Sequence, residues 1–307
     1  MLPRGRNLFT RFFHTRHAEH NHKSKEWKVP LKSILIFGTS TLFLWYNSES
    51  DKMTGRRKLN VLSEENRENA ANILLQTFIS PVIIQHPDQW VKFQNQSNKE
   101  RLIDATMAVH LQGKHIQHNH PGYERLSRIS DKLKSSNPDM ILDRPVFHLS
   151  QEGLLDAYSM ANHIVFSVKT LDLWTDDQMA FIIAHEISHH LLDHHMENVS
   201  WMLVEIVVTL GLFFTAPNKI LFAFGWILLK PFRLLVTYPI KRQGEFEADD
   251  VGFKMMTKAG YDQREALRFW DKLERLNPSI RGFQYLRDHP SHIDRKVRMK
   301  ENINSKS

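Results

Sequence analysis

The sequence predicts an α+β fold that is mainly α, with a small sheet, preceded by one membrane anchor helix. Capping patterns and the stretch MAFIIAHEISHHLLDHH, residues 179–195, which lacks Gly and Pro, indicate the helices. Two short segments rich in β-branched and aromatic residues, 144–149 and 163–168, indicate the strands. An uncharged stretch near the start, residues 33–46, indicates the anchor.

The composition narrows the class of protein. The chain has 307 residues, of which 41% are hydrophobic, and this is enough for a sizeable core. Its net charge of +7 suits an anionic membrane surface or nucleic acid about equally well. We predict no nucleic-acid partner, because the sequence has no zinc knuckle, RNP-like aromatic strand or Gly-rich phosphate loop. It also has no cysteine, so any zinc site must use histidine and carboxylate ligands.

Residues 1–28 form a basic segment typical of a mitochondrial transit peptide. Arginines interleaved with Leu8, Phe12 and Phe13 come before the first acidic residue, Glu19. Such an Arg-rich, acid-poor and amphipathic start is the pattern of these peptides. The alternatives are a disordered basic tail, or a protein that binds lipid or nucleic acid through this region.

Residues 29–47 are predicted to be the transmembrane anchor. The uncharged part ends in an aromatic pair that suits the membrane interface, and Lys32 can reach back to that interface. Lysines precede the segment and acidic residues follow it, so the positive-inside tendency places the amino-terminal side in the matrix of a mitochondrion. A buried core helix is the alternative.

Residues 48–58 are predicted to be a linker, and residues 59–303 one domain. In its first part we expect helices after Ser63 and over 88–111, then a solvated loop over 112–125 whose histidines are not ligands. These loop histidines are His115, His118 and His120.

Three further helices are predicted after the strands. A capping box at Thr175 and Gln178 opens one helix over 176–195. A second runs over 243–258 and ends before Gly260, and a capping box that starts at Asp262 opens a third, to about Leu276.

The motif His185-Glu186-Ile187-Ser188-His189 indicates a metal site. Two histidines four residues apart share one face of a helix and can bind a single Zn²⁺. The glutamate beside the first histidine then faces the open coordination position, where it can take a proton from the metal-activated water. Apolar neighbours suggest that the motif is buried.

The remaining histidines of the cluster are not predicted to bind the metal. His190 and His194 are also four residues apart, but this pair points about 100° away on the helix and lacks the intervening glutamate. His195 does not share a face with His189. We interpret all three as exposed or as neighbours of the ligands.

A catalytic zinc site needs a third ligand, usually histidine or carboxylate. Glu245 is the best candidate, and Asp249 shares its helix face, so one carboxylate can bind the metal while the other accepts a ligand histidine's N–H. Glu247 and Asp250 point elsewhere and are predicted to be solvated. A solvated acidic helix face is the alternative for the whole cluster.

Two residues near the carboxyl end complete the predicted site. His289, before Pro290, can donate to the oxyanion that forms during acyl transfer, and Arg295 can anchor this loop by an ion pair. The alternatives are a loop histidine and a surface arginine. Residues 201–240 form a hydrophobic insertion whose uncharged runs are too short to cross a bilayer, so a buried or membrane-embedded helical hairpin over the site is favoured over two spans.

These motifs together resemble the zinc metallopeptidases that include the type I CAAX prenyl protease and bacterial HtpX. The resemblance rests on the HExxH helix, the insertion, the E-x-x-x-D pattern at Glu245 and Asp249, and the later His289-Pro290 and Arg295. It implies a gluzincin-type domain with one Zn²⁺ per subunit, held by His185, His189 and Glu245. It also implies that Glu186 is the general base and that His289 donates to the oxyanion. Asp249 is implied to contact a ligand histidine without binding the metal.

Within that family, the basic start, the early hydrophobic segment, GRRKLNVL (55–62) and AGYD (259–262) are similar to members of the mitochondrial inner membrane. The similarity implies a stress-activated endopeptidase, single-pass, with its catalytic domain in the intermembrane space. Its implied substrates are membrane proteins such as the dynamin-like fusion GTPase, and a homo-oligomer is left open. A non-catalytic, zinc-stabilised membrane scaffold is the alternative, but a structural site would not require Glu186.

One departure from the family pattern concerns the turn before the second strand. The family usually has Asn-Ala-Phe and then Pro-Gly-Gly, whereas this chain has Asp156-Ala157-Tyr158 and Ala161-Asn162-His163. The loss of two glycines puts the turn geometry in doubt. We expect the strand over 163–168 to be the edge to which an extended substrate adds.

Overall fold

The computed structural model describes residues 42–63, 66, 69, 116, 119–140, 145–151, 157–160, 162–215, 233–278 and 289–304. The chain divides into one unit over Met1–Leu44 and a second over Trp45–Ser307. All elements considered below belong to the second unit. The predicted transit segment, residues 29–41 of the predicted anchor and the predicted helix over 88–111 lie outside the described residues.

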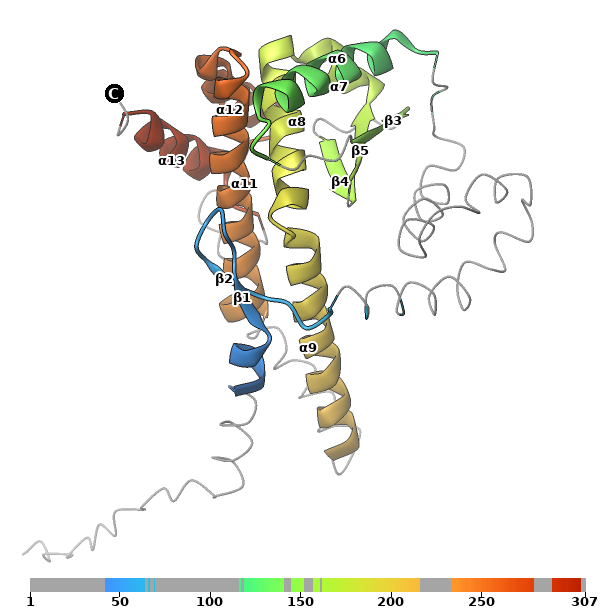
Figure 1. Cartoon of the computed structure of the whole chain (residues 1–307), viewed down its shortest axis with the longest axis vertical. Coiled ribbons are helices and arrows are strands. Elements are labelled where there is room, and N and C mark those ends of the chain that lie inside the picture. The colour runs from blue at the N-terminus through green and yellow to red at the C-terminus, as the bar shows by residue number, and fades with distance from the viewer. Residues whose placement is uncertain are drawn as a thin grey trace, which may run out of the picture. The chain divides into compact units, whose positions relative to one another are not determined.

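Two long helices, α8 (Asp176–Leu191) and α11 (Tyr238–Lys258), pack side by side and form the centre of the fold (Figure 1). The Thr175 side chain accepts from the Gln178 amide and the Gln178 side chain accepts from the Thr175 amide, so the predicted capping box is confirmed. The predicted end of α11 is also confirmed, since Gly260 follows it with φ of 73°. This helix begins at Tyr238, earlier than predicted.

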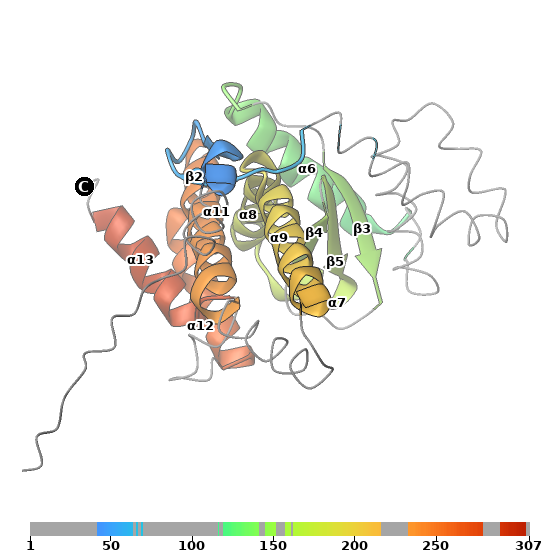
Figure 2. The same ribbon diagram turned by 90° about the horizontal axis from the view of Figure 1, so that it is seen from below.

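A three-stranded sheet covers one side of α8, and α11, α12 (Gln263–Leu276) and α13 (His292–Asn304) lie on the opposite side (Figures 1 and 2). Its strands are β3 (Val146–Ser150), β4 (Ala157–Met160) and β5 (His163–Ser167), in the order β3-β5-β4. The two predicted strands are confirmed as β3 and β5, which pair in parallel, whereas β4 pairs antiparallel to β5.

The prediction that the strand at 163–168 is an edge is wrong. β5 is the central strand of the sheet and is buried along its whole length, because β3 and β4 flank it on both sides. The edge strands are β3 and β4, and β4 contacts α8.

The remaining elements complete the core around α8 and α11. The sequence predicts α12 correctly from Asp262, whose side chain caps the helix, to Leu276. Glu265 is the last residue of the predicted capping box, and its side chain accepts a hydrogen bond from the Gln178 side chain. The other helices are α6 (Pro121–Ser136), α7 (Val168–Leu173) and α13 (His292–Asn304). Buried apolar side chains of α6, β5, α8, α11 and α12 form one continuous cluster.

The loop predicted over 112–125 is partly wrong, because α6 begins at Pro121. The His120 side chain accepts from the Gly122 amide and so caps this helix. Proline at the first helical position supports the same start, since its missing N–H is not needed there. His115 and His118 lie outside the described residues.

The segment predicted to be a linker forms a β-hairpin. Strands β1 (Ser48–Ser50) and β2 (Arg57–Leu59) pair antiparallel across a turn in which Gly55 has φ of 71°. The Asp51 side chain accepts from the amides of Met53 and Thr54 and holds this turn. We call residues 48–59 the amino-terminal hairpin.

The single helix predicted over 176–195 is wrong at its carboxyl end. Helix α8 ends at Leu191, Asp193 takes a left-handed conformation with φ of 54°, and a new helix, α9 (His194–Thr215), starts directly after it. Asp tolerates this backbone region better than most residues. His190 and His194 are therefore on different helices and are not a helical i, i+4 pair.

The described part of the hydrophobic insertion comprises most of α9 and a π-helical turn, η3 (Arg233–Thr237). Buried Glu205 joins the two, because it accepts from Arg233 and from Thr237. Within the described residues, no helix is both long and apolar enough to cross a membrane. The apex of the predicted hairpin lies outside these residues.

Candidate active site

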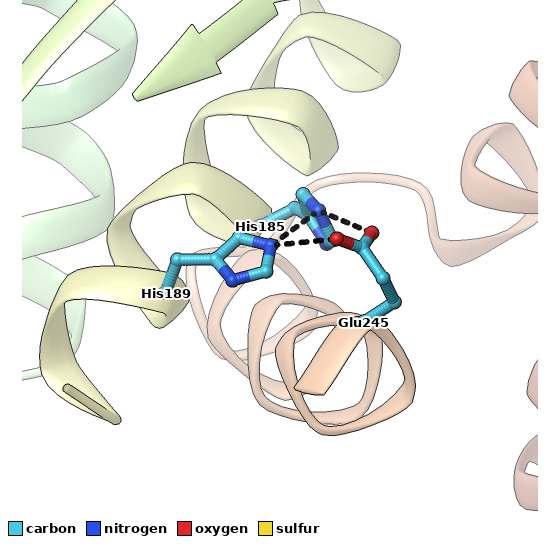
Figure 3. A group of neighbouring side chains, drawn as sticks. All are labelled: His185, His189 and Glu245. Carbon is cyan, nitrogen blue, oxygen red and sulfur yellow. Dashed lines mark hydrogen bonds and ion pairs between the residues drawn. The ribbon is translucent and has the colours of Figure 1, made fainter. Parts of the chain in front are cut away.

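Three predicted ligands converge on one point between α8 and α11 (Figure 3). The Nε2 atoms of His185 and His189 lie 3.1 Å apart. Each lies 3.6 Å from a carboxylate oxygen of Glu245. His185 and Glu245 are buried, and His189 is half-buried.

The spacing of these atoms fits a zinc ion. Ligand atoms about 2.05 Å from a tetrahedral ion lie about 3.3 Å from each other, and the ligand atoms of this triad all lie within 4.8 Å of one another. Two imidazoles and one carboxylate are a donor set that zinc prefers at catalytic sites. Burial lowers the pKa of His189 well below its ordinary value, which keeps it neutral.

Glu186 lies beside the ligands and is buried with them. Burial raises the pKa of its carboxyl to about 6, against the opposing effects of His185 and of a hydrogen bond from the Ser159 side chain. A carboxyl with a pKa near neutrality can both accept and return a proton. Ser159, on the edge strand β4, was not predicted, because four residues of mixed character carry no strand signal.

Asp249 contacts His185, and Arg295 in turn contacts Asp249. Asp249 Oδ1 lies 3.0 Å from His185 Nδ1, and Arg295 Nη2 and Nε lie 2.6 and 2.7 Å from the two Asp249 oxygens. Arg295 also lies 2.9 Å from Glu245 and stacks over the ring of Trp270. Although burial opposes it, the positive charge of Arg295 holds the pKa of Asp249 and Glu245 below their usual range. The sequence predicts only that Arg295 anchors a loop, whereas the structure shows that Arg295 contacts Asp249 and Glu245 directly.

A cavity of about 380 Å³ lies against the ligands. His289 lines it, is exposed, and places its Nδ1 3.2 Å from Glu245. Its role as oxyanion donor stays a prediction. His195 also lines the cavity, with its Nε2 buried and without a hydrogen bond among the described residues, so it lies closer to the site than the sequence predicts.

Of two more residues near the site, His194 is a neighbour of a predicted ligand, which is one of the possibilities predicted for it, whereas Glu247 differs from the prediction. His194 is buried, and its Nδ1 lies 2.9 Å from His189 Nδ1. Glu247, predicted to be solvated, is buried and accepts from Arg56 of the amino-terminal hairpin. Asp250, on the same helix, is half-buried and pairs with Arg298. The partner of Glu247 is nearly two hundred residues away in the chain, so no local pattern could indicate its burial.

Gly252 lets α11 approach α8 next to the first ligand. A Cβ at this position would lie 2.8 Å from the His185 nitrogen and 3.0 Å from its Cα. Because backbone cannot rotate away, we expect Gly252→Ala to separate the helices, to lower the free energy of unfolding by about 1–3 kcal/mol and to weaken zinc binding. Urea denaturation and zinc titration measure the two effects.

Gly244, on the same helix, provides the matched control for this substitution. A Cβ there would meet the His194 ring at 3.5 Å, which is ordinary contact. We expect Gly244→Ala to leave the free energy of unfolding unchanged or to raise it by up to about 1 kcal/mol, because alanine favours helices. Equal stability of the two variants would contradict the close approach inferred at Gly252.

An HExxH helix, a glutamate from a second helix and a buried glutamate beside a cavity are the pattern of the gluzincin class of metallopeptidases. The chain belongs to peptidase family M48, whose family model matches residues 114–303.

The chain is also similar to individual proteins. The chain is 27% identical over 290 residues to the mitochondrial metalloendopeptidase OMA1 of Bos taurus, covering 89% of this chain and 49% of that protein. It is 26% identical over 274 residues to OMA1 of Danio rerio, covering 85% of this chain and 51% of that protein. The chain thus spans about half the length of these curated relatives. It also aligns with the crystal structure of S. mikatae Ste24p over 90% of this chain and 77% of that one, with a TM-score of 0.43 and 14% identity.

Proposed function

We propose that this protein is a membrane-anchored zinc endopeptidase of the mitochondrial inner membrane. It hydrolyses peptide bonds of membrane proteins in protein quality control and in stress-induced processing of the dynamin-like fusion GTPase. The convergence of His185, His189 and Glu245 beside buried Glu186 carries the proposal. The name of the relatives, mitochondrial metalloendopeptidase, supports the location and the reaction type.

In this proposal His185, His189 and Glu245 hold one Zn²⁺. When bound, the ion supplies Lewis-acid activation of water and of the peptide carbonyl. Glu186 accepts the proton of the attacking water and returns it to the leaving amine, for which a pKa of about 6 is suitable. His289 lies on the cavity wall, where it can donate to the carbonyl oxygen as negative charge develops there.

The substrate lies along β4 in this proposal. This strand is the edge of the sheet at the cavity, which its residues Ala157, Tyr158 and Ser159 line, whereas the other edge strand is β3. An extended peptide that pairs with an edge strand is held by main-chain hydrogen bonds with little dependence on its sequence. Such binding suits an endopeptidase that cleaves unfolded segments of different membrane proteins.

Membrane attachment is proposed through residues 29–47, with the catalytic domain in the intermembrane space. Helix α9 supports a location close to the membrane, because Met202, Ile206 and Val207 are exposed on it. These apolar side chains gain most when they contact lipid or another apolar surface.

Metal removal tests the proposal. We expect the full chain, purified in detergent, to cleave a membrane-protein substrate, to lose this activity when a chelator removes the metal, and to regain it when one equivalent of Zn²⁺ is added. Gel analysis of the products and elemental analysis of the protein measure the two quantities. Cleavage at an unchanged rate by protein shown to be free of metal would exclude a metallopeptidase.

A further inference from the structure

His189 has polar support that is separate from the support of His185. Its Nδ1, which faces away from the other ligands, lies 2.9 Å from His194 Nδ1. The opposite nitrogen of His194, Nε2, lies 3.1 Å from Glu247 Oε2. His194 and Glu247 are both buried, with exposed fractions of 4% each. The predicted ligand His189 therefore contacts His194, and His194 in turn contacts the carboxylate of Glu247.

The chemistry of these contacts fixes the position of each proton. A carboxylate only accepts hydrogen bonds, so His194 Nε2 must carry the proton that faces Glu247. In the neutral imidazole the other nitrogen, Nδ1, is then an acceptor, and His189 Nδ1 must donate to it. This leaves His189 Nε2 without a proton, which is the form that binds a metal ion.

The amino-terminal hairpin holds Glu247 as an anion. Arg56 Nε lies 2.6 Å from Glu247 Oε1, and the other nitrogens of the same guanidinium lie 2.6 and 2.7 Å from Glu197. Lys58 Nζ lies 3.6 Å from Glu247 and donates to the Leu192 carbonyl at the end of α8.

We propose that His194 is a positioning residue that fixes the tautomer and ring orientation of His189, and that Glu247 and Arg56 hold His194 in place. The hairpin is thereby part of the metal site, although it contributes no ligand. The inference rests on the proposed function, in which His189 binds zinc. Partners of this kind raise metal affinity by about 10–100-fold when they orient a ligand histidine.

Zinc affinity of the full chain, measured by competition with a chelating indicator, tests this role. We expect His194→Phe, which keeps the ring shape but has no nitrogen, to raise the Kd for Zn²⁺ by about 10–100-fold. His194→Asn should recover part of this loss, because its side-chain oxygen can accept from His189. The matched control is His190→Phe, in the same histidine cluster but on the half-buried face of α8, for which we expect an unchanged Kd.

Two further measurements separate positioning from folding. Thermal unfolding of the metal-free proteins should give the same Tm for His194→Phe and wild type, whereas the absorption spectrum of Co²⁺ bound at the site should change, since it reports ligand geometry. If His194→Phe does not fold, Glu247→Gln replaces it. That variant keeps the side-chain shape but no longer dictates the proton on His194 Nε2, and we expect its Kd to rise several-fold.

The outcomes distinguish this inference from the proposed function. If the wild-type chain does not bind Zn²⁺, the proposed function fails and the inference fails with it. If wild type binds Zn²⁺ and the folded His194→Phe or Glu247→Gln protein binds it with the same Kd and the same Co²⁺ spectrum, only the positioning role is wrong.

Discussion

Glu186→Gln is expected to lower kcat/KM for cleavage by about 10²–10⁴-fold, the usual contribution of a general base, while zinc stays bound. Glutamine has the shape of glutamate but cannot accept a proton from water. None of the three ligand atoms belongs to Glu186, so metal binding does not depend on it. The Ser159 side chain, which donates to Glu186, can donate to the glutamine carbonyl as well.

Cleavage of a membrane-protein substrate by the purified full chain, with zinc content measured on the same samples, checks this result. The expected pattern is full zinc occupancy together with nearly complete loss of cleavage. If a zinc-loaded Glu186→Gln protein cleaved the substrate at the wild-type rate, Glu186 would not be the general base. The non-catalytic scaffold, which predicts no zinc-dependent cleavage even by wild type, would be supported if the wild-type chain bound zinc but cleaved nothing.

Glu245→Ala is expected to weaken zinc binding by more than about 100-fold, a larger loss than removal of a residue that only orients a ligand. The substitution deletes one of three ligands and also removes a carboxylate that lies 2.9 Å from Arg295. Cleavage should fall at least as far as in Glu186→Gln, since both the ion and its activation of water are lost.

Asp250→Ala is the matched control on the same helix. Asp250 pairs with half-exposed Arg298, a surface interaction worth about 0–1 kcal/mol, and it does not line the cavity. We expect this variant to keep its zinc and its cleavage rate, as measured by chelator competition and the same assay. Wild-type zinc affinity in Glu245→Ala would mean that another residue is the third ligand.

The sequence predicts the parts of the fold whose signals are local. The capping box at Thr175, the glycine after α11 and the β-branched content of β5 are each encoded within a few residues, and each is confirmed. Helical periodicity also puts His185 and His189 on one face of their helix, and their Nε2 atoms lie 3.1 Å apart, while the metal-binding role of these two residues and of Glu245 stays a prediction. Their convergence on one point required α8 and α11 to be neighbours, which only the family resemblance implied.

The features that the sequence does not predict depend on distant partners. The stretch over 176–195 has neither Gly nor Pro, yet the helix ends at Leu191, where Lys58 binds the Leu192 carbonyl from a position 134 residues away. Glu247 is buried because Arg56 reaches it across a separation of 191 residues. Strand β4 forms because β5 offers it a free edge to pair with, and its own four residues show no alternation that would indicate a strand.

The amino-terminal hairpin shows that the matched family region is shorter than the physical unit. The family model begins at residue 114, whereas Arg56 and Lys58 lie well before it. A fragment that begins at residue 114 would keep two buried carboxylates, Glu197 and Glu247, without the arginine that compensates them. A buried charge that loses its partner destabilises a fold strongly. A fragment meant to fold as the catalytic domain therefore needs to begin before Ser48, so that it contains the hairpin together with the catalytic helices.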